Sequence, residues 1–191
     1  PNGHAEVAGP RGRWPDRGAL GKFYWIKEEA PCYYLTVDDD IFYPQNYVRE
    51  MVTAIEKYKR KAMIGIHGLI LHLHGVPRNA DGSPPDYRKH RQLFLFNGHL
   101  IKDKPVHTIG TATCAFHTDL TDMDYTDIME KPHSIDEQLA LYNQKHEIPM
   151  LVKKRGHHWL KHNPIGAHIA PMNKRADVVA ARSRRYYENQ P

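Results

Sequence analysis

The sequence has no long apolar run and contains only two cysteines in 191 residues. A helix that crosses a bilayer needs roughly 20 consecutive apolar residues, and no stretch approaches that length. We therefore expect no transmembrane segment. Both thiols, Cys32 and Cys114, lie in apolar segments typical of strands, where a free cysteine packs as a small core residue. This pattern favours a reducing, cytoplasmic location, while one disulfide and peripheral contact with a membrane stay open.

The start of the chain also lacks the charged and apolar segments of a signal peptide. The first residue is Pro1, so the sequence leaves open whether a preceding segment has been removed. Residues 1–20 are rich in glycine, proline and arginine and show little periodicity. We expect an irregular lead-in there.

Composition and charge fit a folded domain that binds anions. Hydrophobic residues make up 40% of the chain and charged residues 26%, which indicates a globular rather than a disordered protein. The net charge of +5 favours anionic partners such as nucleotide diphosphates, acidic glycans or lipid surfaces. The basic residues are spread along the chain without a recognisable nucleic-acid motif, so no nucleic-acid partner is expected.

The most informative segment is 31–44. Residues 32–37 have the composition of a buried strand, and three consecutive carboxylates follow them, Asp38, Asp39 and Asp40. Adjacent carboxylates at the end of a core strand repel one another and lose hydration unless water or a cation meets them. Mg²⁺ and Mn²⁺ prefer oxygen ligands, and Mg²⁺ typically takes one or two protein carboxylates together with substrate phosphates. The segment therefore predicts a metal-diphosphate site.

Other segments predict helices, strands and one long loop. Apolar periodicity predicts a helix that begins at Tyr43-Pro44 and whose core face consists of Val48, Met51, Val52, Ile55 and Tyr58. A capping-box pattern predicts a second helix that begins at Ser134 and uses Glu137 in the cap. Strands are expected at 62–73, at 106–116 with an interruption at Gly110, and at 148–152, and a surface loop is expected at 75–92.

Several segments taken together match one family. Residues 36–44 read TVDDDIFYP, and residues 21–25 ahead of them read GKFYW. These segments resemble the family 2 type of nucleotide-sugar glycosyltransferase with the GT-A fold. Residues 110–117 (GTATCAFH) and 135–141 (IDEQLAL) are similar to the acceptor-side strand and the catalytic-carboxylate helix of bacterial polysaccharide-type members. The resemblance covers roughly residues 18–162 in the right order, which is more specific than any single motif.

The resemblance implies an α/β fold of the GT-A, Rossmann-like kind. Its sheet would be mixed, mostly parallel and flanked by helices, with nucleotide bound at the carboxyl ends of the strands. The domain would cover residues 21–162, followed by a basic C-terminal extension at 163–191. Family members normally have a strand-helix-strand half ahead of the Gly21-Lys22 segment, where it supplies much of the base pocket. No such half is found here, so either upstream residues are missing or the base pocket is built differently.

The resemblance also implies a reaction and a donor site. A sugar would pass from a nucleotide-diphosphate donor, with UDP-sugars favoured, to a hydroxyl of a glycan acceptor, with inversion. Asp38 and Asp40 would hold Mn²⁺ or Mg²⁺, and Asp39 would meet the ribose or the donor sugar. Lys22 would pair with the phosphates of the nucleotide. The alternative for Lys22 is a solvated surface lysine.

On the acceptor side, the resemblance makes Asp136 the catalytic base. The alternative is that Asp136 complements the positive end of its helix. Thr111 and Thr113 would bond acceptor hydroxyls, with ordinary strand packing as the alternative. His158, or the neighbouring His157, would complete the metal shell.

Two other classes of protein stay open at this point. A metal-dependent phosphohydrolase would use the same carboxylates to break down nucleotide sugars with water. A non-catalytic module for glycan or nucleic acid would use the aspartates for structure only.

Overall fold

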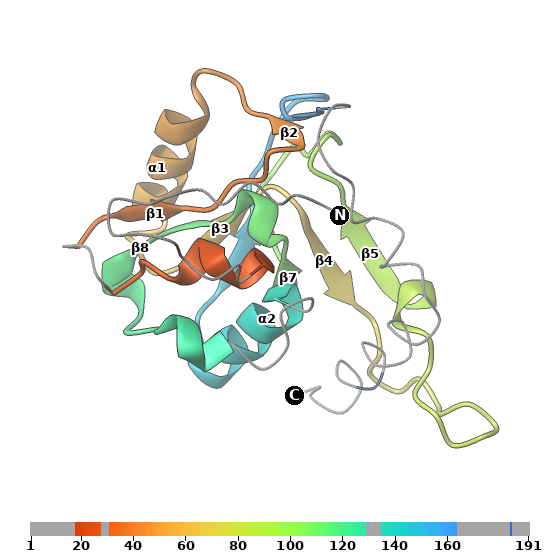
Figure 1. The fold of residues 1–191 in the computed structure, drawn as a ribbon. Coiled ribbons are helices and arrows are strands. Elements are labelled where there is room, and N and C mark those ends of the chain that lie inside the picture. Colours follow the sequence, from red (N-terminus) through yellow and green to blue (C-terminus); the bar gives the residue numbers. More distant parts are fainter. Residues whose placement is uncertain (1–17, 28–30, 129–134, 164–183, 185–191) are drawn as a thin grey trace, which may run out of the picture.

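The computed structural model describes residues 18–27, 31–128, 135–163 and 184. Its centre is a five-stranded sheet in the order β1-β8-β3-β9-β6 (Figure 1). The bounds of these strands are Tyr33–Leu35 (β1), Ala115–His117 (β8), Met63–Gly65 (β3), Met150–Val152 (β9) and Lys104–Pro105 (β6). Two smaller sheets consist of Arg91–Phe94 (β5), Gly68–Leu71 (β4) and Thr108–Ile109 (β7), and of Lys161–His162 (β10) and Ile41–Phe42 (β2).

In the part of the chain that the structure describes, two α-helices flank the central sheet, and several short 3₁₀ helices lie between the strands. The α-helices are Tyr47–Lys57 (α1) and Ile135–Lys145 (α2). The 3₁₀ helices are Gly18–Phe23 (η1), Tyr87–Lys89 (η2), Thr111–Thr113 (η3), Thr118–Leu120 (η4) and Tyr125–Ile128 (η5). Within the described ranges, no helix combines the length and the apolar character that crossing a membrane requires.

Alternating side chains divide the core between the two faces of the central sheet. Ile64, Ala115 and Leu151 belong to the apolar cluster that contains the buried face of α1. The neighbouring residues Met63 and Phe116 belong to the cluster that contains η1 and α2. Because successive residues of a strand point to opposite faces, α1 and α2 lie on opposite sides of the sheet, as Figure 1 shows. The predicted α/β class, with a mixed sheet flanked by helices, is confirmed.

The prediction that the sheet is mostly parallel is wrong for the described residues. Only β3 and β9 pair in parallel, while β1-β8, β3-β8 and β6-β9 are antiparallel. Strand composition does not report direction, and here β8 lies between β1 and β3 and runs against both. As a result β1, β3 and β9 run the same way, and their carboxyl ends share one edge of the sheet with the amino end of β8. This edge is called the carboxyl edge below.

Some predicted elements are shorter or divided. The first helix begins at Tyr47, and its buried residues are Tyr47, Met51, Ala54 and Ile55, whereas Val48 is 59% exposed. The strand expected at 62–73 is divided into β3 and β4, which belong to different sheets. The strand expected at 106–116 is divided into β7, η3 and β8. Both divisions occur where two segments far apart in the chain contact each other. Gly110, between β7 and η3, donates its backbone N–H to the carbonyl oxygen of His67, between β3 and β4, at 2.9 Å.

The remaining predictions are met in part. The strand expected at 148–152 is confirmed as β9, and most of 75–92 is loop, with η2 and the start of β5 at its end. Ser134, most of the lead-in and nearly all of 163–191 lie outside the described residues. The last three residues of the expected lead-in begin η1.

A single carboxylate, Asp103, joins α1 to the segment after β9. Its Oδ2 accepts hydrogen bonds from Lys57 Nζ at 2.5 Å and Tyr58 Oη at 2.8 Å, and its Oδ1 accepts one from Lys154 N at 2.6 Å. Burial raises the pKa of this carboxyl, but the three donors outweigh burial and hold the pKa below its ordinary value. The folded state therefore stabilises the ionised form of Asp103 more than the unfolded chain does.

Replacing Asp103 by asparagine is expected to lower the free energy of unfolding by about 1–3 kcal/mol at neutral pH, because charge-assisted hydrogen bonds are lost. A group whose pKa is depressed on folding stabilises above its unfolded pKa, which is about 3.9 for aspartate, and loses this contribution as the pH falls through the folded value. The difference in the free energy of unfolding between wild type and Asp103→Asn should therefore be constant above about pH 5 and become smaller in acid. Urea unfolding across this range measures it, and a difference independent of pH would contradict the assignment.

Candidate functional site

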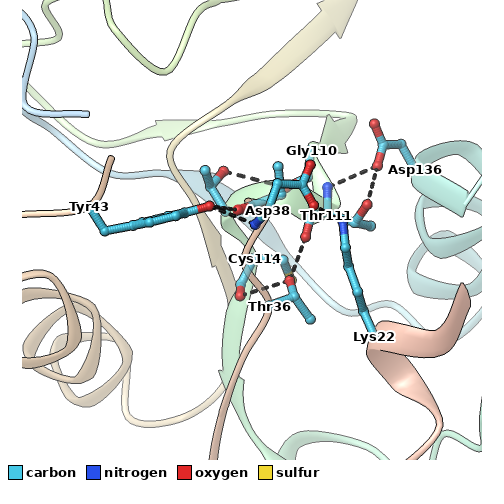
Figure 2. A network of polar contacts seen from close by, with 10 residues as sticks. Lys22, Thr36, Asp38, Tyr43, Gly110, Thr111, Cys114 and Asp136 are labelled. Atoms are coloured by element: carbon cyan, nitrogen blue, oxygen red, sulfur yellow. Dashed lines mark hydrogen bonds and ion pairs between the residues drawn. The ribbon is translucent and has the colours of Figure 1, made fainter. Parts of the chain in front are cut away.

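The 3₁₀ helix η3 lies at the carboxyl edge and binds the predicted catalytic base directly. Asp136, in the first turn of α2, accepts hydrogen bonds at its Oδ1 from Thr111 N and from Thr111 Oγ1, both at 2.8 Å. Thr111 is only 4% exposed, so its hydroxyl is committed to this contact. Figure 2 shows Asp136 pointing toward Thr111. Thr111, which was predicted to bind an acceptor, therefore orients Asp136 in this structure.

The aspartate motif lies on the other side of η3. Asp38 follows β1, and its carboxylate forms an ion pair with the ammonium group of Lys22 from η1. The backbone N–H of Asp38 donates to Tyr43 Oη at 2.9 Å, and Tyr43 Oη in turn donates to Ala112 O at 2.7 Å. The Tyr43 hydroxyl thus links the backbone of the motif to the middle residue of η3, as Figure 2 shows.

A second link comes from the end of β1. Thr36 is 3% exposed, and its hydroxyl donates to Thr111 O at 2.6 Å. Its backbone N–H donates to Cys114 O at 2.9 Å. Because Thr36 is two residues from Asp38, these contacts fix the base of the aspartate motif against η3. Four predicted site residues, Lys22, Asp38, Thr111 and Asp136, are therefore connected through one turn.

The sequence did not identify Thr36 and Tyr43 as functional candidates. Both belong to the segment 36–44, and their position within the motif is the only signal that the sequence offered for them. Burial raises the pKa of Tyr43, as do the three nearby carboxylates, while its hydrogen bond to the Asp38 backbone opposes this. The phenol is therefore neutral and able to donate at ordinary pH.

His67 is a further group at this edge that the sequence did not assign to the site. It follows β3, and a Cβ atom added to Gly110 would lie 3.2 Å from His67 Cβ and 3.3 Å from its Cδ2. Burial lowers the pKa of His67, the Asp136 carboxylate raises it, and Arg155 and Arg91 lower it further. The balance lowers the pKa below the ordinary value, so the imidazole is neutral at pH 7.

Two other predicted residues make contacts that differ from the predicted ones. Thr113 is fully buried, and its hydroxyl accepts from Ile66 N at 3.2 Å and from His67 N at 3.1 Å, which gives it a structural role in place of the predicted contact with an acceptor. His158 is exposed, and its backbone N–H donates to Asn97 O at 2.9 Å.

The middle and last aspartates are held through their backbones. Asp39 O accepts from Asn163 Nδ2 at 3.0 Å, and Asp40 O accepts from Asn163 N at 2.7 Å. The Asp39 residue is exposed and Asp40 is half-buried. Asn163, which follows β10, thus fixes the turn that carries Asp39 and Asp40. β10 itself pairs with β2, the strand that follows this turn.

The site fits a hard divalent cation only if a ligand contributes oxygen atoms. In the described part of the chain, no three His, Cys, Asp or Glu side chains are close enough together to hold a metal ion, so His158 does not complete such a set with Asp38 and Asp40. Mg²⁺ is commonly held by one or two carboxylates plus substrate phosphates and water. Asp38 already pairs with a cation, the Lys22 ammonium, which shows that its carboxylate is placed to receive positive charge.

Two comparisons of the sequence with known proteins give no match. No protein-family model matches the chain, and no curated protein is detectably similar to it in sequence. The similarity of its motifs to glycosyltransferases of family 2 remains a prediction from the sequence. Function is therefore inferred from the geometry of the carboxyl edge.

Proposed function

We propose that this protein transfers a sugar from a nucleotide-diphosphate donor, with UDP-sugars favoured, to a hydroxyl of a glycan acceptor, with inversion. One observation carries the proposal: Asp38 and Asp136 are both linked to η3, and their carboxylates have different surroundings. Asp38 pairs with a cation, whereas Asp136 is bound by neutral donors of Thr111. Such a difference suits one group that takes positive charge and one that takes a proton.

Asp136 has the geometry of a general base. Its Oδ1 is occupied by two hydrogen bonds from Thr111, while its Oδ2 has no hydrogen-bond partner among the described residues. The bound oxygen fixes the direction of the carboxylate, and the other oxygen is left to accept the proton of an acceptor hydroxyl. A positioned base of this kind typically contributes about 10²–10⁴-fold to the rate.

The donor diphosphate belongs at the aspartate motif. Asp38 and Asp40 would hold Mn²⁺ or Mg²⁺, and the exposed Asp39 would meet the ribose or the donor sugar. When bound, the metal would stabilise the negative charge that develops on the leaving diphosphate. Lys22 adds a second positive charge at the same place, and Tyr43 keeps the Asp38 backbone in position.

Calorimetric titration of UDP with and without Mn²⁺ tests the proposal. We expect UDP binding that depends on Mn²⁺ and disappears in Asp38→Ala and in Asp40→Ala, while thermal unfolding shows that both variants remain folded. Asp122→Ala is the matched control because Asp122 is an exposed carboxylate outside the carboxyl edge. Failure of UDP, GDP and CDP to bind in the presence of Mn²⁺ would overturn the proposal. Conversion of a UDP-sugar to UMP and sugar 1-phosphate without any acceptor would instead identify a phosphohydrolase.

A further inference from the structure

The ion pair between Lys22 and Asp38 occupies the carboxylate that a metal would need. Their side chains are 22% and 32% exposed, so the pair is neither fully solvated nor deeply buried. Lys22 thus pairs with the first of three adjacent carboxylates. A divalent cation that binds the same carboxylate must compete with the ammonium group.

The position of Lys22 is built into the fold. Its carbonyl oxygen accepts a hydrogen bond from Tyr34 Oη at 2.6 Å, which fixes η1 against β1. The next residue, Phe23, is fully buried, and its ring stacks on Tyr34 with centroids 6.5 Å apart. Because η1 is anchored in this way, the backbone of Lys22 has a fixed position from which its ammonium group reaches Asp38.

We infer that Lys22 serves as the cation at Asp38 in the free protein and transfers to the diphosphate when a metal-nucleotide complex binds. This inference rests on the proposed function and goes further, since it specifies which form of the ligand the site selects. A free divalent cation displaces the ammonium from Asp38 and leaves it without an anionic partner. A metal-diphosphate complex displaces it and supplies phosphate oxygens as new partners, so the complex binds with less competition than the metal alone.

The inference predicts effects of opposite sign for one substitution. In Lys22→Met the competitor is gone, so the affinity for Mn²⁺ alone should rise by about two- to fivefold, the range expected for a partly exposed ion pair. The affinity for UDP in saturating Mn²⁺ should fall by about tenfold or more, because a charged partner of the phosphates is lost. A lysine with a merely structural role would not raise the affinity for the metal.

The experiment measures Mn²⁺ binding by the loss of the electron paramagnetic resonance signal of the free ion, and UDP binding by calorimetry. Lys22→Met is compared with wild type and with Lys27→Met, because Lys27 pairs with Asp122 in an exposed contact elsewhere on the surface. Lys22→Arg, which retains the charge, should keep the weak affinity for Mn²⁺ alone. Unfolding of each variant in urea shows that the fold is retained.

The outcomes separate the inference from the proposed function. An affinity for Mn²⁺ that is unchanged, lower or undetectable in Lys22→Met overturns the inference, even if UDP binds wild type as proposed. A gain in Mn²⁺ affinity together with a loss of UDP affinity supports it. If UDP, GDP and CDP all fail to bind wild type but Mn²⁺ affinity still rises in Lys22→Met, the competition at Asp38 stands, and both the transfer to a diphosphate and the proposed function fall.

Discussion

Replacement of Asp136 by asparagine is expected to lower kcat for sugar transfer by about 10²–10⁴-fold, while the affinity for UDP stays within about twofold. Asparagine retains an Oδ1 atom that accepts the two hydrogen bonds from Thr111, so the first turn of α2 should keep its position. The amide cannot take a proton from an acceptor hydroxyl. The loss should therefore appear in the chemical step and not in donor binding.

Transfer kinetics with a UDP-sugar and a glycan acceptor, combined with UDP calorimetry, measure both parts of this prediction. Asp122→Asn serves as the control, because it removes an exposed carboxylate away from η3. If Asp136→Asn retains the wild-type kcat, another group is the base. His67, whose neutral imidazole lies at the same edge, is then a candidate.

Replacement of Gly68 by alanine is expected to cause a large loss of stability. A Cβ atom at this position would lie 2.6 Å from Val152 Cγ2 and 2.7 Å from Thr108 O. The carbonyl belongs to β7, which pairs with β4 through Gly68, so the backbone of one strand would have to move. Overpacking of this kind costs about 1–3 kcal/mol and occasionally more.

Urea unfolding of Gly68→Ala measures this loss, and Gly156→Ala is a matched control because nothing lies within 4 Å of a Cβ atom added there. The displacement should also reach the candidate site, since β7 leads directly into Gly110 and η3. UDP binding by Gly68→Ala should thus weaken even at temperatures where the variant is folded. Equal stability of the two glycine variants would show that β7 adjusts without cost.

The sequence predicted those parts of the fold that depend on local pattern. The apolar strand before Asp38 follows from the composition of a short window, and the helix that carries Asp136 follows from a capping-box pattern. The prediction that Asp38 and Asp136 belong to one site came from the family resemblance. The structure places both at the carboxyl edge, connected through η3.

The parts that were missed depend on contacts between distant segments. η3 forms where Gly110 N donates to His67 O and Thr113 Oγ1 accepts from two backbone N–H groups after β3, and no local pattern reports such bonds. The ion pair of Lys22 with Asp38 joins residues 16 positions apart. The direction of β8 and the split of the segment 62–73 between two sheets likewise follow from tertiary pairing.

The short turn η3 has a consequence for how such a protein can diversify. Its backbone binds Asp136 through Thr111 and the aspartate motif through Ala112 and Tyr43, so main-chain atoms set the spacing between the two carboxylates. The loop that follows β4, residues 75–86, lies outside this set of contacts. Changes in the length or sequence of that loop should therefore leave the separation of the carboxylates constant.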